Sequence, residues 1–301
     1  MMSRPPKLRP HPWRRAAITG AMLGALFLAT ISTPASAVAT NHEPHFYMAL
    51  GGSGSVGVQP TAAAPRGRPT DAGYANDLLV MERSRWTDLR LIRLGCPGAT
   101  TLTMLRGGGR CAYRTGSQLA AAVAFIRRQP STVLVTLDLG FNNVRRCLQH
   151  QHVDEACVAQ AIGIVHRQLS GILTSLRAAG GPGLEIVGVG HYDPYLGDYL
   201  KGPAGRAFAV NSLGVVTLLN DALRSDYGAA GVPMADVAAS FDTADIGMTT
   251  LAGVGSVPED VARVCALTWM CAPTPLGPNP HANDAGYRAI SQAIAAVLPA
   301  H

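Results

Sequence analysis

A serine near the start of the chain and a histidine near its end have the setting of a nucleophile and its general base. Ser53 stands in the glycine-rich run Gly-Gly-Ser-Gly-Ser over residues 51–55, and His281 lies near the end of the chain. A serine hydroxyl attacks a carbonyl carbon when a neighbouring base takes its proton, and histidine titrates in the pH range where it can do so. The two residues therefore predict acyl-transfer chemistry, provided that the fold brings them together.

Such a reaction also needs fixed donors for the negative oxygen that develops on the substrate. The backbone amides of Ser53 and Gly98 and the side-chain NH₂ of Asn142 are the candidates. One donor of this kind typically lowers the barrier by roughly 2.7–4 kcal/mol. We therefore expect these three groups to form an oxyanion hole.

These residues follow or lie between segments with the patterns of strands and helices. We expect buried strands over 46–50, 89–94, 133–139, 184–189 and 232–237, and helices over 71–85, 117–128, 158–179, 207–227 and 284–297. The near-continuous hydrophobicity of 133–139 indicates burial on both faces, as in a parallel sheet. Residues 56–70, rich in Pro, Ala and Gly, are expected to form an extended loop. We expect Asp71 and Asp284 to cap the first and last helices.

Alternating strands and helices predict an α/β fold with a parallel sheet and helices on both faces. Ligands on such sheets bind beyond the carboxyl ends of the strands. Ser53, Gly98 and Asn142 all follow a predicted strand, so the pattern places them at one edge of the sheet.

Four blocks in this order resemble the SGNH (GDSL-like) hydrolase superfamily, in particular its secreted actinobacterial branch. They are residues 47–53 with Ser53, Gly98, residues 140–143 with Asn142, and His281 followed by Asn-Asp-Ala-Gly-Tyr over 283–287. The resemblance covers essentially all of residues 38–301. It implies a three-layer, flavodoxin-like sandwich around five parallel strands. It also implies a metal-free and cofactor-free carboxylesterase or lipase that cleaves small-molecule or lipid esters.

The chain departs from the family pattern where the family usually has aspartates. Gly52 precedes the serine, Asn143 ends the third block, and the Asp that orients the imidazole is replaced by Asn279 or Pro278. A backbone carbonyl of that loop could still accept the imidazole N–H and leave a Ser–His dyad, with a less stabilised imidazolium. The alternative is a degenerate member that binds an acyl or glycan ligand without cleaving it.

The first 37 residues are typical of a signal peptide. The uncharged apolar segment 16–31 is followed by Ala-Ser-Ala over 35–37 and preceded by five basic residues: Arg4, Lys7, Arg9, Arg14 and Arg15. We expect cleavage after Ala37, by either Sec or twin-arginine export, no stable membrane anchor, and a secreted or envelope-associated protein.

Removing this segment changes the charge of the chain. It contains five of the 25 Lys and Arg residues and none of the 19 Asp and Glu residues, so residues 38–301 have a formal charge of +1. This balance does not favour a nucleic-acid partner. The remaining length suits one domain, expected to be a monomer.

Six cysteines in an exported chain indicate disulfides. Fifteen pairings are formally open, and the sequence does not choose among them. We expect the pairs that are neighbours along the chain: Cys96–Cys111, Cys147–Cys157 and Cys265–Cys271. A zinc site is disfavoured because no Cys-x-x-Cys pair is present.

Two competing interpretations of the first block are weaker. Gly52, Gly54 and Gly57 have the spacing of a dinucleotide-binding loop, but they continue into Val58-Gln59-Pro60 instead of a helix. Ser55 competes with Ser53 as nucleophile and is expected to be structural.

Overall fold

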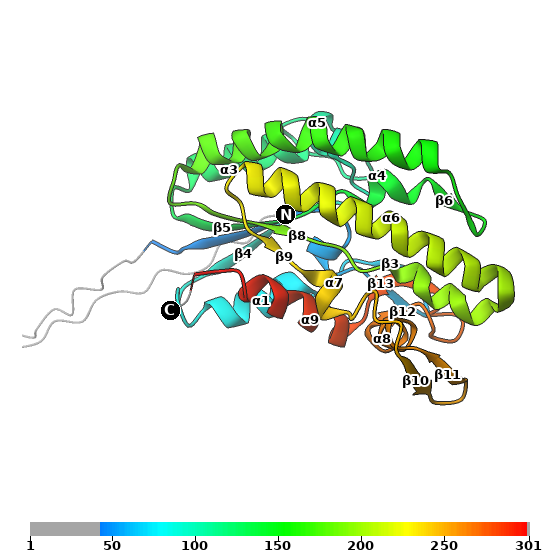
Figure 1. Ribbon diagram of the computed structural model, residues 1–301. Coiled ribbons are helices and arrows are strands. Elements are labelled where there is room, and N and C mark those ends of the chain that lie inside the picture. The colour runs from blue at the N-terminus through cyan, green and yellow to red at the C-terminus, as the bar shows by residue number, and fades with distance from the viewer. Residues whose placement is uncertain (1–42, 300–301) are drawn as a thin grey trace, which may run out of the picture. The chain divides into compact units, whose positions relative to one another are not determined.

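The computed structural model describes residues 43–299 (Figure 1). The predicted signal peptide therefore lies outside the described residues. A five-stranded parallel sheet runs in the order β4-β1-β5-β8-β9. Its strands are β1 (Phe46–Gly51), β4 (Arg90–Arg93), β5 (Thr132–Asp138), β8 (Glu185–Val189) and β9 (Met234–Ala235). The predicted α/β fold is confirmed.

Helices cover both faces of the sheet, which explains why its inner strands β1, β5 and β8 are mainly apolar. In Figure 1, α3 (Gln118–Arg128), α5 (Glu155–Gly180) and α6 (Gly202–Ala229) lie above the sheet, and α1 (Tyr74–Glu82) and α9 (Asp284–Ala295) lie below it. In β1, Met48 and Leu50 belong to the core under the first group, and Tyr47 and Ala49 to the core over the second. The period of two along a strand produces this division.

Short elements connect the layers. The remaining helices are η1 (Gly54–Val56), α2 (Thr101–Arg106), α4 (Phe141–Arg145), η2 (Pro194–Lys201), α7 (Val237–Ser240) and α8 (Glu259–Leu267). Four antiparallel pairs complete the fold: β2 (Gln59–Thr61) with β3 (Ala64–Arg68), β6 (Leu148–Gln149) with β7 (His152–Val153), β10 (Met248–Leu251) with β11 (Gly255–Pro258), and β12 (Thr268–Trp269) with β13 (Asn279–Ala282).

Several local expectations were wrong. Part of the expected loop 56–70 is the hairpin β2–β3, in which Gln59 pairs with Arg68. Strand β9 has only two residues, because Pro233 has no N–H to extend the ladder.

Among the described residues, none of the helices combines the length and hydrophobicity needed to span a membrane.

Both expected aspartate caps were also wrong. Gly73 is the N-cap of α1, and Asp71 instead pairs with Arg93 at 2.6 Å. Asn283 is the N-cap of α9, where its side chain accepts a hydrogen bond from the Gly286 amide. An N-cap needs an extended backbone one residue before the first helical turn, a position the sequence pattern located only approximately.

Three disulfides join neighbouring cysteines: Cys96–Cys111, Cys147–Cys157 and Cys265–Cys271, with Cα–Cα distances of 5.9, 5.5 and 5.0 Å. The first holds the loop that follows β4, and the second joins the segment after α4 to the start of α5. Two of the bridges therefore constrain segments at the carboxyl edge of the sheet.

Candidate active site

The chain turns sharply where β1 ends, and this turn presents Ser53. Gly51 has φ +111°, and a Cβ there would lie 1.8 Å from the carbonyl oxygen of Asp138, so only glycine fits. The Gly52 amide then donates to that carbonyl at 2.7 Å. Ser53 follows with helical backbone angles, at the start of η1, and its side chain is half-buried.

Ser55 has a different environment from Ser53. It is fully buried, and its hydroxyl donates to the Gly52 carbonyl at 2.7 Å. That bond closes the turn and occupies the Ser55 proton. Within residues 43–299 the Ser53 hydroxyl makes no comparable bond, which leaves it available to a substrate.

Asp138, at the end of β5, supports the same turn from below. Its Oδ2 accepts a hydrogen bond from the Ser55 amide at 3.2 Å. Its Oδ1 lies 3.9 Å from Nδ1 of His191, a buried residue that follows β8. Burial raises the pKa of Asp138 and lowers the pKa of His191. His191 was not among the residues predicted from the sequence, although its position after a parallel strand was the available signal.

His281 lies on β13, and Asn279 fixes its ring. Nδ1 of His281 is 2.6 Å from Oδ1 of Asn279, which also accepts the His281 backbone N–H at 3.1 Å. The Asn279 NH₂ group donates to the Pro65 carbonyl at 2.9 Å, which orients its oxygen toward the imidazole. Nδ1 therefore carries the proton, and Nε2 is left as an acceptor.

Pro278, the other residue predicted to orient the imidazole, makes no hydrogen bond to it within the described residues and lines an outer cavity instead. The expected backbone acceptor is thus replaced by a side-chain amide. An amide fixes the tautomer as a carboxylate does, but it brings no negative charge to the imidazolium.

Two electrostatic effects keep His281 neutral. Burial, and secondarily the positive charge of Arg145, lower its pKa to about 4. At neutral pH the ring is therefore an uncharged base with a free Nε2.

The two remaining donor candidates approach the site from the other side. Asn142 is on α4, and its Nδ2 lies 3.1 Å from the Ala99 carbonyl and 3.1 Å from where a Cβ of Gly52 would be. This bond occupies one amide hydrogen and leaves the other free. Gly98 has φ +85°, a conformation that favours glycine.

Asn143 anchors the loop that contains Gly98. It is buried, accepts a hydrogen bond from the Thr101 amide at 3.2 Å, and donates to the Thr101 hydroxyl at 2.9 Å. Asn143 stands where the family usually has Asp, and its side chain joins α4 to the start of α2.

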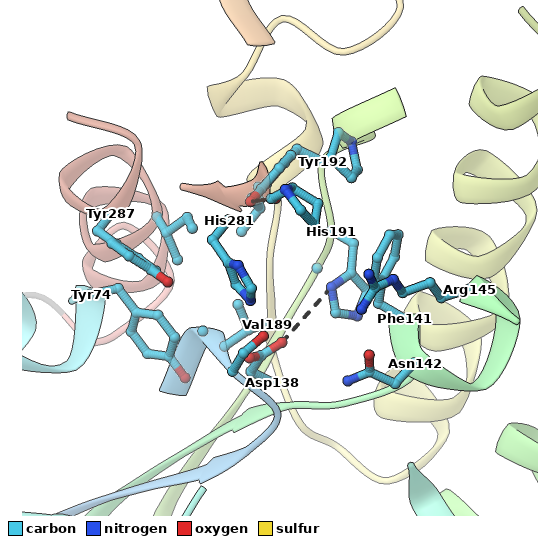
Figure 2. A pocket seen from close by; sticks show the side chains of 17 residues that line it. Tyr74, Asp138, Phe141, Asn142, Arg145, Val189, His191, Tyr192, His281 and Tyr287 are labelled. Carbon is cyan, nitrogen blue, oxygen red and sulfur yellow. Dashed lines mark hydrogen bonds and ion pairs between the residues drawn. The ribbon is translucent and has the colours of Figure 1, made fainter. Parts of the chain in front are cut away.

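Two cavities meet at these residues. An inner cavity of about 80 Å³ and an outer one of about 370 Å³ share five residues in their linings: Ser53, Asn142, Arg145, Pro280 and His281. Gly98 lines the outer cavity and not the inner one. Figure 2 shows the His281 ring projecting into the inner cavity from β13, with Tyr74 and Tyr287 on one side and Phe141 on the other.

The residues of the described chain do not gather into a cluster of three or more His, Cys, Asp or Glu side chains that could hold a metal ion. The chemistry that this site can support from its own groups is a hydroxyl, a neutral imidazole and hydrogen-bond donors around one small space.

The structure resembles an extracellular lipase from Streptomyces rimosus, with 17% identity and a TM-score of 0.52 over 83% of this chain and 99% of that chain. Weaker likenesses are a goat rumen metagenome lipase, Lip_vut3 (17%, TM-score 0.47, 84% and 96% covered), and phospholipase A1 from Streptomyces albidoflavus NA297 (21%, 0.44, 73% and 94%). No curated protein matches the chain.

The first of these likenesses concerns the fold alone. The family is shown by the sequence, because the sequence model of the GDSL-like lipase/acylhydrolase family matches residues 49–289. This span includes the turn of Ser53 near one end and the strand of His281 near the other. The chain therefore belongs to the GDSL-like lipase/acylhydrolase family.

Proposed function

We propose that this chain is a secreted serine ester hydrolase in which Ser53 is the nucleophile and His281 the general base. The observation that carries the proposal is the convergence of Ser53, Asn142 and His281 on the same two cavities, with Nδ1 of His281 held by Asn279. Its substrates are carboxylic esters of small molecules or lipids, and it acts as a monomer.

The first half of the reaction forms an acyl-enzyme. The Ser53 oxygen attacks the ester carbonyl carbon while Nε2 of His281 takes the hydroxyl proton. The carbonyl oxygen becomes negative and is stabilised by the amides of Ser53 and Gly98 and by Nδ2 of Asn142. The C–O bond to the alcohol then breaks, and His281 returns the proton to the leaving oxygen.

The second half repeats these steps with water. The oxygen of a water molecule attacks the acyl carbon while His281 takes a proton from that water. The bond between the acyl carbon and the Ser53 oxygen then breaks, His281 returns the proton to the Ser53 oxygen, and the carboxylic acid leaves. Asn279 is a positioning residue in both halves, because it acts through the imidazole and not on the substrate.

The test compares hydrolysis of p-nitrophenyl butyrate by the wild type and by Ser53→Ala and His281→Ala. Matched controls are Ser84→Ala and His166→Ala: Ser84 is exposed between α1 and β4, and His166 is an exposed residue of α5 paired with Asp226. We expect a fall in kcat of at least about 10³-fold in both site variants and wild-type rates in both controls.

Undiminished hydrolysis in either site variant, with the fold retained by circular dichroism, would rule out this mechanism. Complete absence of hydrolysis in the wild type, across short- and long-chain esters, would favour the alternative of a binding protein that does not cleave its ligand.

Secretion is part of the proposal. The three disulfides support it, because such bonds persist in oxidising compartments. Expression of the full chain in an exporting host should release into the culture medium a protein whose N-terminal residue is Val38, as determined by mass spectrometry.

A further inference from the structure

Four arginines surround the outer side of the proposed active site. Arg66, Arg110 and Arg145 line the outer cavity of about 370 Å³, and Arg145 and Arg146 line a neighbouring cavity of about 430 Å³. The two cavities share Gly98, Arg110, Asn142 and Arg145 and form one region, which we term the arginine groove. No Asp or Glu lines either cavity.

The four guanidinium groups are exposed, and within residues 43–299 none of them takes part in an ion pair. Residues 38–301 have a formal charge of only +1, so this concentration of positive charge is local. Grouped like charges repel one another, and a bound anion removes that cost.

The segments that carry these arginines are held by the same contacts that build the active site. Arg66 is on β3, next to Pro65, whose carbonyl binds Asn279. Arg110 precedes Cys111, which is bonded to Cys96 in the loop of Gly98. Arg145 is on α4 with Asn142. The groove is therefore fixed relative to Ser53.

The position of the groove assigns it to one side of the scissile ester. The Nε of Arg110 lies 3.9 Å from where a Cβ of Gly98 would be, directly at the proposed oxyanion hole. The inner cavity has polar groups, among them Asp138, Arg145 and His191, on part of its wall. The rest of the wall is apolar, including Tyr74, Phe141 and Ile290, and suits the hydrocarbon of the acyl group. The alcohol part of the ester then lies in the groove.

We infer that the arginine groove binds a phosphate group carried on the alcohol part of the substrate. Guanidinium groups arriving from three segments suit a tetrahedral anion with several oxygens better than a planar carboxylate, which one arginine can satisfy with two parallel bonds. The inference deepens the proposed function and depends on it: the preferred substrates are acyl esters of phosphorylated alcohols, either lipids or soluble esters.

The experiment compares three butyrate esters: those of glycerol, of glycerol 3-phosphate and of 3-hydroxypropanoate. At low salt we expect kcat/KM for the phosphate ester to exceed that for the neutral ester by about 10- to 100-fold, and the excess to shrink as salt rises. The carboxylate ester should fall between them. Repeating the series with palmitate distinguishes a lipid from a soluble source of the same phosphate.

The matched variants are Arg66→Gln/Arg110→Gln/Arg146→Gln and, as control, Arg127→Gln/Arg128→Gln at the end of α3. In the first variant, the ratio of kcat/KM for the phosphate ester to kcat/KM for the neutral ester should fall to near one. The control variant should keep the wild-type ratio. An equal or greater preference for the carboxylate ester, no preference, or a preference retained in the triple variant would overturn the inference.

The two proposals fail separately. Hydrolysis of the neutral ester without a preference for the phosphate ester would support the proposed esterase activity and refute phosphate binding in the arginine groove. Calorimetric titration of Ser53→Ala with glycerol 3-phosphate measures the groove without catalysis, and binding lost in the triple arginine variant is the expected result. Absence of binding contradicts the groove, whatever the hydrolysis assay shows.

Discussion

At the residue scale, an amide occupies the place beside the proposed general base that a carboxylate has in a catalytic triad. Oδ1 of Asn279 accepts a hydrogen bond from Nδ1 of His281, because the NH₂ group of Asn279 donates to the Pro65 carbonyl. The imidazole is thus oriented without a nearby negative charge, and burial with Arg145 lowers its pKa to about 4. A base of this kind stays neutral well below pH 6.5 but is a weak proton acceptor.

This arrangement predicts different effects of two substitutions at position 279, one on the pH profile and one on kcat. In the wild type, the acid limb of kcat/KM should lie near pH 4, because protonation of His281 ends its action as a base. Asn279→Asp places a carboxylate against Nδ1, favours the imidazolium and should move that limb up by about 1–3 pH units.

Asn279→Ala should lower kcat by about 10²-fold with little change in KM, since the residue acts through the imidazole. Initial rates from pH 3.5 to 8 measure both effects. An acid limb that does not move in Asn279→Asp, together with wild-type kcat in Asn279→Ala, would show that Asn279 does not position the base.

The sequence reached these residues because glycine, serine, asparagine and histidine followed recognisable strand ends or loop blocks. It could not distinguish Asn279 from Pro278 as the orienting residue, because that choice depends on the Pro65 carbonyl, more than 200 positions away. It also left His191 and the four arginines unassigned, since each is unremarkable until the fold brings it beside Ser53.

At the element scale, the short helices α2 and α4 act as one unit. Asn143 joins them through two hydrogen bonds to Thr101, and Asn142 adds a bond to Ala99. The loop between Cys96 and Thr101 is therefore fixed both by a disulfide and by side-chain amides. Sequence patterns predicted neither helix, because segments of five or six residues have little periodicity.

Asn143→Ala tests this unit. It leaves the buried Thr101 amide and hydroxyl without their partners, which should cost about 1–3 kcal/mol of stability. The proposed oxyanion hole should loosen with it, so kcat should fall by about tenfold or more. Val165→Ala, at a fully buried residue of α5, is the stability control, since it should lower the melting temperature without touching the site.

Denaturant unfolding and p-nitrophenyl butyrate hydrolysis measure the two variants side by side. If kcat falls equally in both, the loss reflects general destabilisation, and the specific role of Asn143 is refuted.

At the scale of the whole molecule, the strand order positions the chemistry. Residues after β1 and β5, which are neighbours in the sheet, contribute Ser53 and Asn142, and β13 returns His281 to the same edge. The parallel sheet was predictable from apolar strands alternating with helices. The hairpins were not, because their residues are too few or too polar to distinguish from loops.

Asp193 gives the folded chain a pH dependence of its own. The carboxyl is fully buried, caps η2 through the Tyr195 amide and accepts from Ser212, yet burial raises its pKa to about 7. The native state thus holds this proton more tightly than the unfolded chain, so the stabilisation it provides is complete below about pH 4 and declines as pH rises to 7.

Asn at this position does not titrate. Relative to the wild type, Asp193→Asn should therefore gain stability as pH rises from 4 to 7, by up to about 1.4 kcal/mol per pH unit. Urea unfolding at pH 4, 5.5 and 7 measures the difference. A constant difference across these values would mean that Asp193 is ionised in both states.

The central claim is that the Ser53 oxygen is the nucleophile and that His281 activates it. A fluorophosphonate probe, followed by intact mass and peptide mapping, tests it most directly. We predict a single adduct on Ser53, absent in Ser53→Ala and formed far more slowly in His281→Ala. An adduct on Ser55, or equal labelling of the wild type and His281→Ala, would contradict the account.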